Sequence, residues 1–130
     1  MAQAPQKVGI IVDPEFGERL HALAARMPLW VADTPANRAA AEANRRTHPA
    51  AFDGMGVTTI RIDPEEEPAE WAAEVLSLVL EHHGEYAQDP PVSVLEFIGT
   101  EPTPALRELL AEYGFSVVQP IAAGFRACAA

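Results

Sequence analysis

The sequence contains a single cysteine, Cys128. One cysteine excludes a disulfide bond within the chain and any zinc site built from several cysteines. A nucleophilic role would need a base that the fold brings to this end of the chain, and an unreactive small side chain is the simpler interpretation. Because low cysteine usage suits a reducing compartment, the expected location is the cytoplasm.

Positive charge is also scarce. Nine lysine and arginine residues stand against 19 acidic ones, the net charge is −10, and Lys7 is the only lysine. A nucleic-acid backbone or an anionic membrane would repel such a chain. Arg38, Arg45 and Arg46 lie near one another, but no basic stripe with interleaved aromatic residues is present. We therefore expect neither a nucleic-acid nor a membrane partner.

Long apolar runs and glycine-rich phosphate loops are missing as well. No segment approaches the roughly 20 apolar residues that cross a bilayer, and the run Val8 to Val12 is too short for the core of a signal peptide. Neither G-x-G-x-x-G nor G-x-x-x-x-G-K-[ST] follows an expected strand, since Gly54-Met55-Gly56 precedes one. A nucleotide phosphate cradle is therefore not predicted, and no cofactor is expected apart from the magnesium ion considered below.

Short apolar runs alternate with helical patterns along the whole chain, whose 130 residues suit one domain, 1–130. Strands are expected at residues 8–12, 29–32, 57–62, 92–98 and 115–118. Helices are expected at residues 16–27, 35–46, 71–80 and 106–113. This alternation predicts a three-layer α/β fold with a mostly parallel, five-stranded sheet and helices on both faces, of the Rossmann-like or flavodoxin-like class.

The helix starts carry the most specific local signal. Asp13-Pro14, Thr34-Pro35 and Thr103-Pro104 each place a capping residue before a proline that suits the first helical position. Glu67-Pro68 is a weaker example of the same pattern. The helix over 35–46 has a face that is mostly alanine, which favours helix but buries little area.

Strand centres and helix stripes predict the core, because these positions face the opposite layer. The residues expected to be buried are Ile10, Ile11, Trp71, Val75, Leu78, Val79, Leu95, Leu109 and Val118.

Polar side chains gather where the expected strands end. Ligands of open parallel sheets usually bind beyond the carboxyl ends of the strands. The residues expected at this edge are Asp13, Glu15, Asp33, Asp63, Thr100 and Glu101. One interpretation is that they cap helices or lie in turns that are exposed to solvent. The other is that some of them converge on Mg²⁺, with Asp13 and Asp63 as candidate ligands, because this ion favours one or two carboxylates plus water.

The order of elements resembles that of response-regulator receiver domains. By position, the resemblance implies that Asp13 belongs to an acidic cluster and that Asp63 accepts a phosphoryl group. It also implies that Thr100 is the Ser or Thr that follows the fourth strand in that family. The chain departs from the family pattern where Pro14 replaces a second acid. No lysine follows the fifth strand, which ends at Gln119-Pro120, and this puts phosphoaspartate chemistry in doubt.

Two classes of function follow. The first is a non-catalytic binding or regulatory module with an unknown protein or small-molecule partner, since no complete catalytic constellation is present. The second is a magnesium-dependent phosphoryl-transfer or hydrolytic domain, of a degenerate receiver-like type, that works from the acidic edge; its catalytic residues are unknown. The apolar tail from Ile121 to Ala130 also predicts a homodimer, because such a patch is usually covered.

Overall fold

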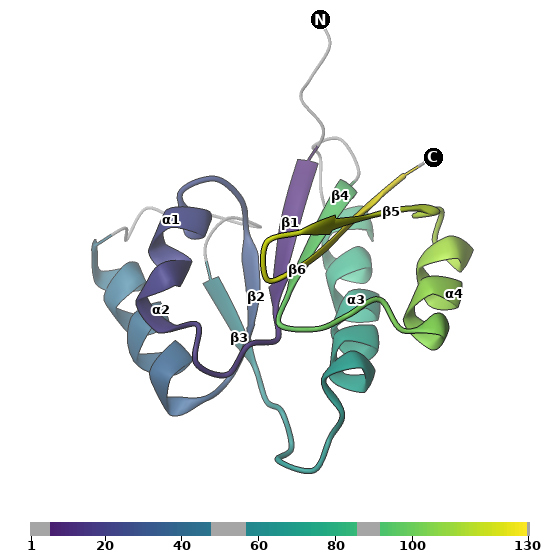
Figure 1. The fold of residues 1–130 in the computed structure, drawn as a ribbon. Coiled ribbons are helices and arrows are strands. Elements are labelled where there is room, and N and C mark those ends of the chain that lie inside the picture. Colours follow the sequence, from purple (N-terminus) through teal and green to yellow (C-terminus); the bar gives the residue numbers. More distant parts are fainter. Residues whose placement is uncertain (1–5, 48–56, 86–91, 130) are drawn as a thin grey trace, which may run out of the picture.

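The computed structural model describes residues 6–47, 57–85 and 92–129. Within these ranges the backbone forms a six-stranded sheet and four α-helices, arranged as Figure 1 shows. The strands are β1 (Gln6–Ile11), β2 (Leu29–Ala32), β3 (Val57–Ile60), β4 (Val92–Ile98), β5 (Val117–Ile121) and β6 (Gly124–Cys128). The helices are α1 (Leu20–Ala24), which follows the 3₁₀ turn η1 (Gly17–Arg19), α2 (Pro35–Thr47), α3 (Pro68–Glu85) and α4 (Pro104–Glu112).

The sheet has the strand order β3-β2-β1-β4-β6-β5. Strands β1 to β4 pair in parallel, and β6 runs antiparallel to both β4 and β5. The predicted α/β fold with a mostly parallel sheet is therefore confirmed. The predicted number of five strands is wrong, because the alanine-rich end of the chain forms a sixth strand, β6. The fifth strand also begins later than predicted, since Phe115 lies before β5 and is buried in the core.

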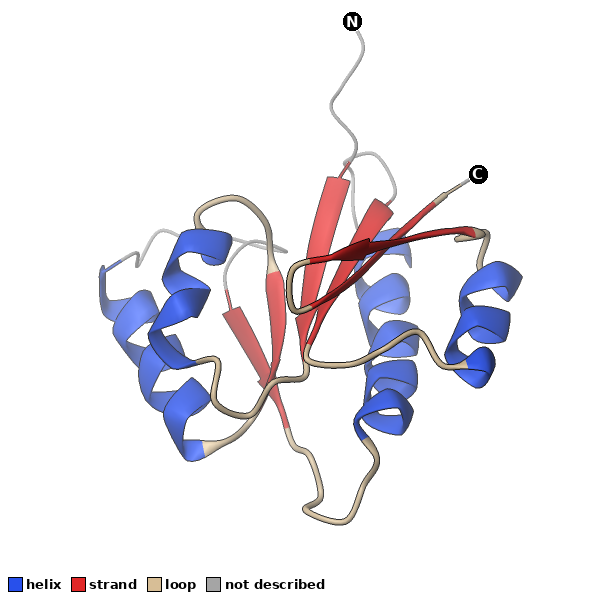
Figure 2. Ribbon diagram, in the orientation of Figure 1, coloured by secondary structure: helices blue, strands red, loops and turns tan. Residues whose placement is uncertain are grey.

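Alternate strand residues face two separate hydrophobic clusters, one on each side of the sheet. Val8 and Ile10 pack with residues of α3 and α4, whereas Ile11 packs with residues of α1 and α2. Figure 2 shows the two helix pairs on opposite sides of the strands. This follows from the strand period of two residues, which turns successive side chains to opposite faces. The described part of the chain is therefore broadly a three-layer structure.

Three of the four proline-marked helix starts are confirmed. Thr103 caps α4, since its Oγ1 accepts a hydrogen bond from the N–H of Leu106 at 3.3 Å, and Thr34 does the same for α2 through the N–H of Asn37 at 3.3 Å. Helix α3 begins at Pro68, directly after Glu67. In each case proline occupies the first helical position, where its missing N–H costs no hydrogen bond.

The fourth start, at Asp13-Pro14, is wrong. Asp13 Oδ1 accepts a hydrogen bond from the N–H of Glu15 at 2.9 Å, so the aspartate closes a local turn instead of capping a helix. Helical structure begins only at Gly17, whose φ of 55° lies in the left-handed region that glycine tolerates.

Most of the predicted core is buried. Ile10, Ile11, Trp71, Val75, Val79 and Leu95 are buried, while Leu109 and Val118 are partly buried against the same cluster. Leu78 was predicted wrongly, because 45% of its surface is exposed. The buried stripe of α3 widens toward Ala72 and Leu76 instead. No helix in the described ranges, α3 included, is long and apolar enough to cross a membrane.

The apolar tail is part of the sheet. Phe125 of β6 is 1% exposed and stacks on Phe97 of β4, with ring centroids 4.6 Å apart. Gly124 leaves room for this pairing, since a Cβ there would lie 1.7 Å from the carbonyl oxygen of Phe97. Of the apolar residues that suggested a homodimer surface, Phe125 and Ala127 are buried within the chain. The homodimer itself stays a prediction, and Ala130 lies outside the described residues.

The stripe of α3 yields a matched test. We expect Val79→Ala to lower the free energy of unfolding by on the order of 1–3 kcal/mol, because it removes buried methyl groups and leaves a cavity. Leu78→Ala, one position along, should change it by no more than about 0.5 kcal/mol, because Leu78 faces solvent. Urea titration of both variants measures the difference. Equal losses would show that the buried face of α3 is assigned wrongly.

Candidate functional site

The carboxyl ends of the four parallel strands lie along one edge of the sheet, at the lower side of Figure 1. We call this edge the carboxyl edge. All the predicted site residues lie in the loops that follow these strands, in the spatial order Asp63, Asp33, Asp13 with Glu15, then Thr100 with Glu101. The structure therefore places these residues along one edge of the sheet and spreads their side chains over the ends of four strands.

The loops after β1 and β4 touch where the chain turns to opposite faces of the sheet. The N–H groups of Val12 and Asp13 both donate to the carbonyl oxygen of Ile98, at 2.7 and 3.2 Å. Gly99 has φ 96°, and a Cβ at this position would lie 2.4 Å from the backbone nitrogen of Asp13. Only glycine allows this approach, so the backbone itself closes the gap between β1 and β4.

The side-chain amide of Asn37 holds the loop after β1. Asn37 is fully buried; its Oδ1 accepts a hydrogen bond from the N–H of Gly17 at 2.8 Å. Its Nδ2 donates to the carbonyl oxygens of Asp13, at 2.9 Å, and Ala32, at 3.1 Å. Thr34 adds a hydrogen bond from its Oγ1 to the carbonyl oxygen of Pro14, at 2.6 Å. The first turn of α2 therefore fixes the path of the loop that carries Asp13.

Asn37 was not predicted from the sequence, because alanines dominate the pattern of this helix. Ala40 and Ala41, three and four positions later, are both buried. Residues at this spacing share a helix face. Amides on a mostly alanine helix face, Asn37 just after the Thr-Pro start and Asn44 seven positions later, were the available signal.

The three candidate aspartates do not share one centre. Each faces an arginine of its own: Asp13 with Arg19 at 2.9 Å, Asp33 with Arg38 at 2.8 Å and Asp63 with Arg61 at 3.6 Å. All three arginine side chains are more than half exposed, so these pairs add little to stability. Within the described ranges, no three histidine, cysteine or acidic side chains are placed to hold a metal ion together.

The strand order explains the separation. In receiver domains the order 2-1-3-4-5 puts the third strand beside the first. Here β3 is an edge strand, and β2 lies between it and β1. Asp63 is therefore two strands away from Asp13, whereas the receiver resemblance implies that they are neighbours.

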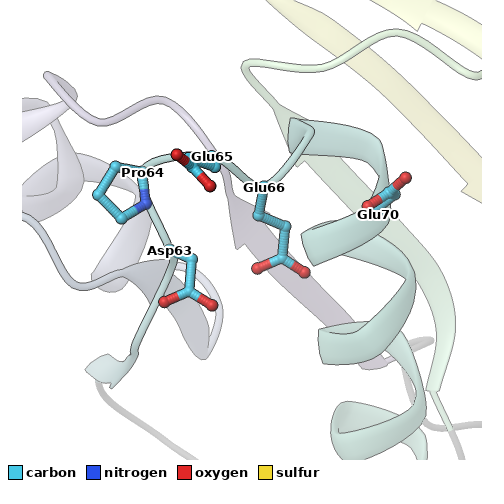
Figure 3. Close-up of a pocket in the computed structure, with 5 residues that line it drawn as sticks. All are labelled: Asp63, Pro64, Glu65, Glu66 and Glu70. Carbon is cyan, nitrogen blue, oxygen red and sulfur yellow. The ribbon is translucent and has the colours of Figure 1, made fainter.

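A hollow of about 530 Å³ opens in the loop between β3 and α3. We call it the acidic hollow, because its lining is Asp63, Pro64, Glu65, Glu66 and Glu70. Figure 3 shows the carboxyl groups of Asp63 and Glu66 on the same side of the loop. Among the described residues, the exposed Arg61 forms the only ion pair with this lining, so the negative charge of the hollow is weakly compensated.

Two contacts shape the loop of the acidic hollow. The indole Nε1–H of Trp71, which is 1% exposed, donates to the carbonyl oxygen of Arg61 at 2.9 Å. The N–H of Glu66 donates to the carbonyl oxygen of Asp63 at 3.0 Å. Burial, together with a hydrogen bond to Glu74 and its charge, raises the pKa of Glu66 above the ordinary glutamate value. The site therefore crowds negative charge around this carboxyl group.

A second, smaller hollow of about 340 Å³ lies beside the loop after β4. Its lining is Gly99, Thr100, Glu101, Pro102, Ala123 and Gly124. The N–H of Gly99 donates to the carbonyl oxygen of Ala123 at 2.9 Å, which ties this loop to the β5–β6 turn. Thr100 Oγ1 donates to the carbonyl oxygen of Glu101 at 3.3 Å, so this hydroxyl has a local partner.

Comparison with protein-family models, with curated proteins and with solved structures found no match to this chain.

Removing the Asn37 amide should destabilise the fold. We expect Asn37→Ala to lower the free energy of unfolding by on the order of 2–3 kcal/mol, because it leaves the backbone groups of Gly17, Asp13 and Ala32 without their partner. Arg38→Ala, the exposed neighbour on the same helix, should cost far less. Chemical denaturation compares the two. A loss for Asn37→Ala no larger than that for Arg38→Ala would refute the structural role given to the amide.

The raised pKa of Glu66 predicts a pH-dependent effect. A carboxyl group whose folded pKa is raised contributes stability below the unfolded pKa, and that contribution is lost as pH rises through the folded pKa. Glu66→Gln should therefore raise the melting temperature at pH 7 and leave it nearly unchanged below about pH 4, where an unfolded glutamate is protonated.

Glu65→Gln is the matched control, since it removes the same charge from an exposed position in the same loop. We expect a smaller gain from it at pH 7. Identical pH profiles for the two variants would mean that only net charge matters.

Proposed function

We propose that this chain is a non-catalytic binding or regulatory module that takes its ligand at the carboxyl edge. The observation that carries the proposal is the separate pairing of Asp13, Asp33 and Asp63, each with an arginine beside it. Carboxylates that act together in catalysis need to reach one reacting centre, and these serve local turns and ion pairs instead.

The strand order supports a site at this edge by analogy of fold. The run 3-2-1-4 is the order of Rossmann-like sheets, which differ from flavodoxin-like ones in the place of the third strand. Such sheets bind ligands where the strand order reverses, which is here between β1 and β4. The smaller hollow at Gly99 and Thr100 lies beside this point. A fold analogy of this kind supports a location and says nothing about chemistry.

The charge of the edge favours a ligand that carries positive charge. The acidic hollow gathers four carboxylates, three in the loop after β3 and Glu70 in the first turn of α3. Burial, and a hydrogen bond and negative charge from Glu74, raise the pKa of Glu66 in this loop. A cationic group placed beside these carboxylates would stabilise their charged forms. We expect the module to act in the cytoplasm, which the single cysteine supports.

A second candidate is a magnesium-dependent phosphoryl-transfer or hydrolytic domain. One observation favours it: Asp63, the candidate ligand named from the sequence, shares the acidic hollow with Glu65, Glu66 and Glu70. Mg²⁺ needs only one or two carboxylates when waters complete its shell. The separation of Asp13 from this hollow weighs against it.

Thermal unfolding with added salts separates the two candidates. The chain is melted in MgCl₂, in spermidine and in NaCl, all at matched ionic strength, because a net charge of −10 makes any salt stabilising through screening. For a binding module with a cationic ligand, spermidine should stabilise more than matched NaCl, and Glu66→Gln should reduce that gain. Magnesium should then do no more than NaCl.

The magnesium candidate has a different outcome. Mg²⁺ should stabilise by about 2.7 kcal/mol at a hundredfold excess over its Kd, and Asp63→Asn should abolish the effect. Asp13→Asn, two strands away from the acidic hollow, and Glu108→Gln, an exposed change of equal charge on α4, are the controls. A magnesium-specific gain that Asp63→Asn loses and the controls keep would overturn the non-catalytic proposal. If spermidine raises the melting temperature no more than matched NaCl, the proposal of a cationic ligand is wrong.

A further inference from the structure

Strand β5 is an edge strand of the described sheet, where it pairs with β6 alone. An edge strand exposes backbone N–H and C=O groups with which a strand of another chain can pair, and natural proteins usually blunt such edges with charged side chains, proline or a bulge. The run from Tyr113 to Phe125, which contains β5, has no charged residue, although 22% of the whole chain is charged. Charge therefore does not protect this edge.

Hydrogen bonds at the two ends of β6 show which of its backbone groups face β4. The N–H of Gly99 donates to the carbonyl oxygen of Ala123, and the N–H of Ala129 donates to that of Ser93, both at 2.9 Å. Both pairs continue the register of directly opposed residues between β4 and β6. Bonded and non-bonded pairs alternate along an antiparallel ladder. The odd-numbered residues of β6 therefore bond to β4, and its even-numbered residues bond to β5.

The outer edge of β5 follows from this alternation. Gln119 lies opposite Arg126, so the odd-numbered residues of β5 bond to β6, and the backbone groups of Val118 and Pro120 point away from the sheet. Val118 offers an N–H and a carbonyl oxygen there, whereas Pro120 offers only a carbonyl oxygen, because proline has no N–H. Proline is tolerated at this position for the same reason, since no bond to β6 needs its N–H.

We propose that Pro120 prevents β5 from pairing with β5 of a second copy of this chain. The pair that it prevents is antiparallel and centred on Val118, where two uncharged strands can meet without the repulsion that the net charge of −10 causes elsewhere. Each Pro120 puts its ring where the opposing strand needs an N–H, once at either end of this pair. This role of Pro120 does not depend on the ligand proposed for the carboxyl edge.

Amide hydrogen exchange of the wild type tests which groups form the outer edge. The N–H of Gln119 faces β6, whereas the N–H of Val118 faces solvent. After correction for the intrinsic rate of each residue, NMR should show that the Val118 N–H exchanges about tenfold faster, or more, than the Gln119 N–H. Equal protection of the two groups in the free chain would overturn the proposal, because the edge would then offer no N–H around which a second strand could pair.

Substitution of Pro120 in the full chain tests the block itself. Pro120→Thr supplies the missing N–H and restores one hydrogen bond at each end of the pair. The self-association constant should therefore rise about tenfold to a hundredfold over the wild type. Pro120→Ala, which supplies the same N–H without a β-branched side chain, should act in the same direction. Gln119→Thr is the matched control, because it places threonine at an exposed neighbouring position whose N–H already faces β6.

Sedimentation equilibrium measures the association, at up to about 1 mM chain and in about 0.5 M NaCl, which screens the repulsion between copies. In Pro120→Thr the Val118 N–H should also become protected as the concentration rises, which places the contact at β5. No gain in association for either Pro120 variant, or an equal gain for Gln119→Thr, would overturn the proposal. So would a wild-type dimer in which the Val118 N–H is protected, since β5 would then pair despite its proline.

Discussion

The buried amide of Asn37 is the contact on which the carboxyl edge depends. It joins the end of β2, at Ala32, to two points of the segment between β1 and α1, Asp13 and Gly17. A loop must find partners for its backbone groups once it leaves the sheet, because buried N–H and C=O groups without partners are costly. The Asn37 side chain, in the first turn of α2, forms hydrogen bonds with three of these backbone groups. The position of Asp13, and of the backbone contact between Asp13 and Gly99, follows from this arrangement.

The partners of each carboxylate determine the electrostatics of the carboxyl edge. Asp13 closes a turn and pairs with Arg19, so its carboxylate already has partners on both sides. The loop after β3 differs, because Trp71 fixes only its beginning and the carboxylates beyond it have few cations nearby. Negative charge therefore gathers in the acidic hollow, where burial and the neighbouring Glu74 raise the pKa of Glu66. A ligand with positive charge would gain most at this point of the edge.

Periodicity and capping predicted most of the elements, and strand order lay beyond their reach. The strands at 29–32 and 92–98 and the helix starts at Pro35 and Pro104 coincide with the structure, since apolar runs and Thr-Pro steps are local signals. Strand β6 was missed because Gly124, Ala127 and Cys128 are small and give a weak alternating pattern. The neighbours of β1 depend on how crossovers pack, which no local pattern encodes. The spread of the aspartates could not be predicted for that reason.

The end of the sheet formed by β6 and β5 differs from the rest because of the last connection of the chain. Parallel strands need a crossover, usually a helix, and these crossovers cover the faces of parallel sheets. Strands β5 and β6 are joined instead by a turn at Ala122 and Ala123, so this step adds a strand without adding a helix. Phe125 and Ala127 can complete the core beneath α3 and α4, but the opposite side of the hairpin receives no cover from its own connection. On that side Arg126 and Glu96 pair at 2.9 Å, and the Glu96 side chain is only 10% exposed, so the charge that faces outward there is compensated within the sheet.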